Sequence, residues 1–154
     1  MVDALERAHG WLRPGGRLVD VHPTAERAYL EVQVGARLVC VGRVHDVDEQ
    51  IGPSARHARA DAAFAAAVER GWFLVEERRE FSFRRYADTV DEMRSYVNGT
   101  WKGAALEERA LLEAARHLLA DPGARLWVRE QVGIVRAIPI PGCRPSPLVA
   151  LRAE

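Results

Sequence analysis

In the first 22 residues, apolar positions recur at helical spacing and then cluster in a short strand-like segment. Residues 2–12 predict a helix, because Leu5, Ala8, Trp11 and Leu12 fall on one of its faces. Pro14 cannot continue that helix, and Gly15 and Gly16 favour a tight turn after it. The next residues, 17–22, read Arg-Leu-Val-Asp-Val-His and predict a strand. Such near-continuous apolar content is typical of a central position in a sheet.

Strand and helix patterns then alternate along the chain. Residues 28–34 and 37–44 predict a β-hairpin around Gly35-Ala36. A helix is expected over 54–70, with Ser54 as its cap and Gly71 as its end, and a strand over 72–84. Helices are expected over 89–96, opened by a Thr89–Glu92 capping box, and over 106–119. Residues 125–132 and 133–140 predict strand with a bend near Gly133.

This order predicts an α/β domain over residues 1–140, followed by an irregular proline-containing tail over 141–154. The segment Leu12-Arg13-Pro14-Gly15-Gly16 and the strand after it resemble class I S-adenosylmethionine-dependent methyltransferases. In that family the same turn leads into the fifth strand of the sheet, well past the middle of the catalytic domain. The passage from helix through Gly71 to Trp72 resembles the entry to the sixth strand.

The resemblance implies a partial Rossmann-like methyltransferase sheet that contains the last strands alone, with a β-hairpin insert and a helical insert. The family holds its cofactor with a glycine-rich loop after the first strand and an acidic residue that ends the second. This sequence has no glycine-x-glycine pattern between a strand and a helix. We therefore expect no cofactor-binding residue in this chain, and S-adenosylmethionine would bind only with a partner chain or a missing N-terminal segment.

On this basis the chain is expected to be methyltransferase-like and unable to transfer a methyl group alone. A truncated gene and one half of a split enzyme both fit this description. The alternative is a non-enzymatic module for small-molecule binding or dimerisation. No catalytic residue is assigned, because methyl transfer depends mainly on the proximity and alignment of the two reactants.

Four side chains are candidates for substrate binding. His22 lies at the carboxyl end of the first strand, where open α/β sheets bind ligands, and its imidazole titrates near neutrality. The alternative for His22 is a strand-end histidine bonded to backbone. Tyr86, Tyr96 and Trp101 flank the helical insert, which the resemblance places over the substrate pocket, although such aromatics also serve as core. Asp20, inside the strand, should have a partner.

Composition and charge narrow the choice of partners. The net charge is zero over 154 residues, which gives no broad electrostatic field for nucleic acid. No apolar stretch has the length of a membrane span and no signal peptide precedes the first helix, so a cytoplasmic location is expected. Cys40 and Cys143 lack metal-ligand spacing, and Cys40, in an apolar run, is expected to be a buried free thiol. The acids of residues 45–49 are expected to be solvated rather than to hold a metal.

The strand at Arg17–Val21 would normally have the family's fourth strand beside it. Without that neighbour its edge is unpaired, and unpaired edges are sites of association. We therefore expect a homodimer or a partner chain at this edge. The alternative is that the hairpin at residues 29–44 folds back and covers the edge within the same chain.

Overall fold

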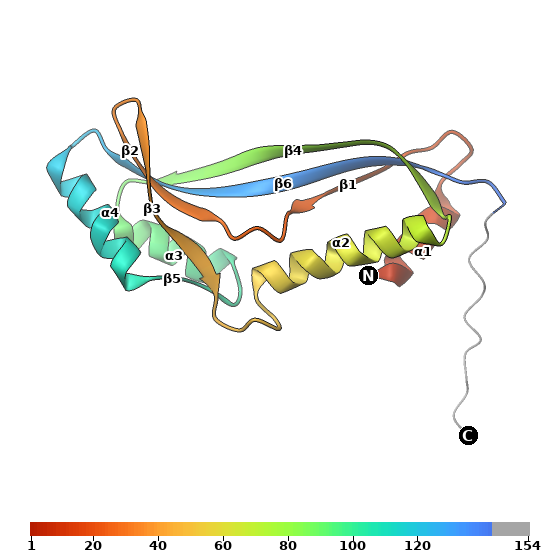
Figure 1. The fold of residues 1–154 in the computed structure, drawn as a ribbon, viewed down its shortest axis with the longest axis horizontal. Helices are drawn as coiled ribbons and strands as arrows, with labels where there is room; N and C mark the ends of the chain where they lie inside the picture. Colours follow the sequence, from red (N-terminus) through yellow and green to blue (C-terminus); the bar gives the residue numbers. More distant parts are fainter. Residues whose placement is uncertain (143–154) are drawn as a thin grey trace, which may run out of the picture.

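The computed structural model describes residues 1–142, which form one long curved sheet with their four helices on one side of it (Figure 1). The strands are β1 (Leu18–Pro23), β2 (Tyr29–Val34), β3 (Arg37–Asp46), β4 (Phe73–Ala87), β5 (Ala104–Leu106) and β6 (Arg125–Pro139). The helices are α1 (Val2–Trp11), α2 (Pro53–Glu69), α3 (Val90–Thr100) and α4 (Glu108–Ala120). The chain is thus a mixed α/β protein with an open six-stranded sheet, in which the pairings of the described strands are antiparallel.

Strand β6 is the centre of this sheet. Along one edge it pairs with β4 over most of its length, and along the other edge it pairs first with β2 and then with β1. Residues 24–28 join these two strands, and the Thr24 amide donates to the Gln131 carbonyl at 2.8 Å between them. Because β1 and β4 are both antiparallel to β6, they run parallel to each other with β6 between them.

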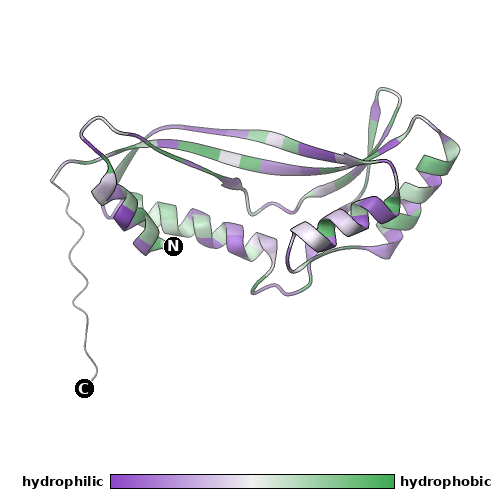
Figure 2. Ribbon diagram, turned by 180° about the vertical axis from the view of Figure 1, so that it is seen from behind, coloured by the Kyte–Doolittle hydropathy of each residue, from purple (hydrophilic) through white to green (hydrophobic). Residues whose placement is uncertain are grey.

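Two hydrophobic cores lie at the two ends of the long strands. In one, Leu126 and Val128 of β6 pack with residues of β2, α3 and α4. In the other, Val135 and Ala137 of β6 pack with Phe73 and with residues of α2. Even- and odd-numbered residues of a strand point to opposite sides, so the two cores lie on opposite faces of β6. The twist of the long β4–β6 pair turns first one face and then the other toward the helices. Hydrophilic and hydrophobic residues are interspersed along these strands (Figure 2).

Most predicted elements are confirmed, including the first helix, the hairpin, the long helix and the helical insert. The Thr89 cap is present as well, since the Glu92 amide donates to Thr89 Oγ1 at 3.1 Å. The reciprocal bond of the predicted capping box is shifted by one residue, because Glu92 Oε2 accepts from the amide of Asp88 at 3.1 Å rather than from that of Thr89. Three details differ from the prediction. β6 continues through Gly133 as a single strand, β5 was not expected, and α2 begins at Pro53 after Gly52 rather than with Ser54 as its cap.

Two expectations are wrong, one about the burial of Cys40 and one about the position of β1 in the sheet. Cys40 is exposed, because its partner Glu31 alternates with the core residues of β2 and Cys40 therefore lies on the sheet face without helices. Strand β1 is at an edge rather than in a central position, since the hairpin continues along β6 and, within residues 1–142, no strand pairs with the second edge of β1. Cys143 and nearly all of the predicted tail lie outside the described residues.

Candidate functional site

A cavity of about 380 Å³ lies between α2 and the sheet, where β1, β6 and β4 run side by side. Its polar lining comes from Asp20 and His22 of β1, Thr24 just after β1, Asp61 of α2, and Arg78, Arg79 and Glu80 of β4. Its apolar lining includes Phe64 and Val135, which belong to the core beneath α2. The cavity therefore combines charged and apolar residues from a helix and three strands.

Strand and helix periodicity bring these groups together. Asp20 and His22 are two residues apart on β1 and share the face that looks toward α2, whereas Val19 and Val21 point away and are 54% and 52% exposed. On α2, Asp61 and Phe64 are one turn apart and share a face. Phe64 is fixed by packing against Phe73, with ring centroids 6.4 Å apart, so Asp61 is held above the strands.

His22 is held by the backbone on one side and by carboxylates on the other. Its Nδ1 lies 2.9 Å from the Pro23 carbonyl oxygen, which accepts only, so Nδ1 carries a proton. Its Nε2 lies 3.3 Å from Asp20 Oδ2 and 3.6 Å from Asp61 Oδ1. The backbone contact foreseen for a strand-end histidine is present, and it leaves Nε2 directed at the two acids. Asp20 thus has the partner that its position in the strand requires.

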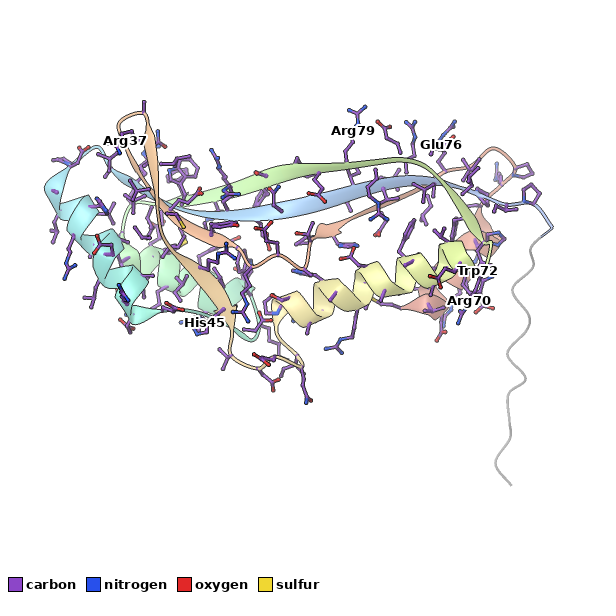
Figure 3. All side chains as sticks on the ribbon, viewed as in Figure 1. Arg37, His45, Arg70, Trp72, Glu76 and Arg79 are labelled. Atoms are coloured by element: carbon purple, nitrogen blue, oxygen red, sulfur yellow. The ribbon has the colours of Figure 1, made fainter. Side chains whose placement is uncertain are left out.

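The β4 side of the cavity is lined by Arg78, Arg79 and Glu80. Arg78 and Glu80 pair with Val135 and Gly133 of β6 and so share the cavity face, while Arg79 between them alternates to the other face. Arg79 and Glu76 project away from the helices (Figure 3), and Arg79 forms an ion pair with Glu77. Glu76 accepts from Arg17 at 2.9 Å, which lowers the pKa of the Glu76 carboxyl.

The predicted aromatic residues lie apart from this cavity. Tyr86, on β4, is exposed with its ring centroid 5.4 Å from that of Trp127. Tyr96 of α3 and Trp101 at the end of α3 have ring centroids 6.2 Å apart and pack against the core of the helical pair. Trp101 also lines a separate small hollow beside His57, whose pKa is lowered by burial. The structure therefore places His22 alone of the four candidates at the cavity.

Sequence reasoning missed Asp61, Phe64, Arg78 and Glu80. A signal was present for the α2 pair, because an acid and an aromatic residue at i, i+3 share a helical face. It was also present on β4, where residues 76–80 hold charged side chains on both faces of a strand. What the sequence lacked was the register that aligns these positions with β1.

A buried ion pair lies on the face of β2 that points away from α3 and α4. Glu31 of β2 is 6% exposed, and its Oε1 accepts from Arg129 Nε at 2.9 Å. The Arg129 guanidinium also covers the ring of Tyr29, 4.2 Å from its centroid, and Arg43 lies 4.4 Å from the same centroid. This cluster joins β2, β3 and β6 and has a structural role.

Comparison with protein-family models, with curated proteins and with solved structures finds no match for this chain. Within residues 1–142, no group of three or more histidine, cysteine, aspartate or glutamate side chains is arranged to hold a metal ion. The same part of the chain has no helix that is long and apolar enough to cross a membrane.

Proposed function

We propose that this chain is the carboxyl-terminal half of a class I S-adenosylmethionine-dependent methyltransferase fold, and that its cavity forms the acceptor side of a methyl-transfer site. The strand order carries the proposal. β1 and β4 are parallel, are connected through the β2–β3 hairpin and α2, and have the antiparallel last strand β6 between them. A methyltransferase sheet ends in the same way, because its last strand runs antiparallel between the fifth and the sixth. The Pro14-Gly15-Gly16 turn precedes β1, as in the family's fifth strand.

The free edge of β1 supports this proposal. α1 and α2 pack on each other beside the same core, so they cover the same face of the sheet. Crossover connections between parallel strands are almost always right-handed, and those on one face advance in one direction across the sheet. The chain advances from β1 through α2 toward β4. A parallel strand that preceded α1 would therefore lie on the other side of β1, away from β4. That side is the free edge.

The cofactor loop would then come with the partner at this edge. A second copy related by a two-fold axis would pair antiparallel through β1, whereas the fold requires a parallel strand. We therefore propose a partner polypeptide that supplies the first strands and the glycine-rich loop, with a homodimer as the alternative occupant. A cytoplasmic location, expected from the sequence, belongs to the same proposal.

One observation favours a second candidate function, a non-enzymatic small-molecule-binding module. The lining of the cavity brings charged and apolar residues of this chain together from α2, β1, β4 and β6. Such a module would bind its ligand with equal affinity whether or not a cofactor-binding half is present.

Calorimetric titration with S-adenosylhomocysteine tests the proposal on two proteins. The first is the isolated 154-residue chain, which we expect not to bind at millimolar ligand. The second is a chimera in which the first four strands and glycine-rich loop of a methyltransferase precede Val2, with the donor half alone as the control. The chimera should bind at micromolar strength where the donor half alone does not. A folded chimera that binds no better than the donor half would refute the proposal.

A further inference from the structure

We infer that the cavity between α2 and β1 binds a small molecule that carries a protonated amine. This inference rests on the proposed function in one respect only, namely that the amine would be the methyl acceptor. The binding itself depends on residues of this chain. It is carried by the hydrogen-bond arrangement around His22, by the charge of the lining and by the shape of the cavity.

The first observation is a shortage of hydrogen-bond donors. The carboxylates of Asp20 and Asp61 both face the single Nε2 of His22, at 3.3 and 3.6 Å. Each carboxylate can accept several hydrogen bonds, so the contact with His22 uses only part of the acceptor capacity of these two lining residues. An ammonium group has up to three N–H donors and is itself charged, and charge-assisted hydrogen bonds are the stronger kind. It would supply what the two aspartates lack.

The second observation is the net charge of the lining. Asp20, Asp61 and Glu80 outnumber the two arginines of the lining, Arg78 and Arg79, when His22 is neutral. The side chain of Arg79 alternates to the other face of β4 and is paired with Glu77, so Arg78 is the arginine whose side chain shares the cavity face. The lining therefore favours a cation over an anion. A carboxylate or phosphate approaching Arg78 would meet Glu80, two residues away on the same strand face.

The third observation is the size and apolar wall of the cavity. Its volume of about 380 Å³ falls in the usual range for small-molecule sites. Phe64 and Val135 form a fixed apolar surface opposite the charged groups. Asp61 has a half-exposed side chain and so connects the interior with solvent. The site thus fits a compact amine with an apolar body.

Three probes with one ring and different charge test this inference: benzylamine, benzyl alcohol and benzoate. Each is titrated into the ¹⁵N-labelled full chain at neutral pH, and the amide signals of His22, Asp61 and Gly133 are followed by NMR. Benzylamine should shift these signals in a saturable way in the millimolar range, and benzyl alcohol should bind about tenfold more weakly or less. Equal binding of amine and alcohol, or tighter binding of benzoate, would overturn the inference.

Two variants locate the ammonium group. Asp61→Asn and Asp20→Asn should each weaken benzylamine binding by about tenfold and leave benzyl alcohol unchanged. Glu49→Gln removes one exposed carboxylate outside the cavity lining and should leave both affinities unchanged, which controls for overall charge. Benzylamine affinity that survives both aspartate substitutions in folded protein would refute the assignment. The amine titration contains no cofactor, so its result is independent of the chimera experiment. A negative result in either experiment therefore does not decide the other.

Discussion

Gly42 of β3 lies directly against the first turn of α4, and its substitution by alanine is a sensitive test of how this helix packs on the sheet. A Cβ at residue 42 would stand 2.5 Å from the Cβ of Ala110, whereas carbon atoms in contact are about 3.5–4.0 Å apart. Ala110 and Leu111 are each 2% exposed, so the helix has little room to move. Overpacking of this kind costs about 1–3 kcal/mol, and the lower backbone entropy of the unfolded alanine variant offsets about 0.4–1 kcal/mol of it.

We therefore expect Gly42→Ala to lower the free energy of unfolding by about 1–2 kcal/mol and the melting temperature by about 3–6 °C. Urea denaturation followed by circular dichroism measures the change. Gly99→Ala is the matched control, because Gly99 lies in α3 with no atom within 4 Å of the added Cβ, and it should stabilise by about 0.5–1 kcal/mol.

The double variant Gly42→Ala/Ala110→Gly decides whether the contact with Ala110 is the cause. It removes the Cβ that the new methyl group would strike, so it should be more stable than the sum of the two single changes predicts, by at least about 0.5 kcal/mol. Additive single changes, or a Gly42→Ala variant as stable as the parent, would show that α4 does not pack on β3 at this point.

Three further predictions concern other parts of the fold, each measured by urea denaturation. Burial raises the pKa of the Glu130 carboxyl, so the folded state binds this proton more tightly than the unfolded state does. The free energy of unfolding should therefore fall as pH rises from about 4 through the raised pKa. Glu130→Gln should be more stable than the parent protein at neutral pH and equally stable in acid. Arg129→Met leaves the Glu31 carboxylate buried without its partner and should cost about 3–5 kcal/mol, and an added Glu31→Gln should recover part of the loss. Thr89→Ala removes the cap of α3 and should cost about 1 kcal/mol, whereas Thr89→Ser should retain most of the stability.

The sequence predicts the local elements well, because their signals are local. Pro14 with two glycines, the Thr89 cap and the apolar periodicity of residues 106–119 each depend on neighbours within a few positions. The arrangement of the strands depends on distant pairing. The exposure of Cys40 and the edge position of β1 follow from which strand lies beside which, and a one-residue change of register would reverse every face.

The candidate site divides in the same way. His22 was predicted because a strand end is a local feature, and its neighbour Asp20 was expected to need a partner. Asp61 reaches His22 from a helix 39 residues later in the chain, as their residue numbers show. Tyr86, Tyr96 and Trp101 were grouped with His22 because of the family resemblance, and the structure gives them different surroundings.

The two cores on opposite faces of β6 make the chain a pair of coupled folding units. Each unit has its own helices, and the ladder of β4 and β6 passes from one to the other around Glu80–Arg84 and Arg129–Gly133. Stability in such an arrangement varies along the chain, and the amides at the two ends should exchange hydrogen with different opening free energies. The ladder of β4 and β6 is the part of the sheet that the cavity end and the helical-pair end share.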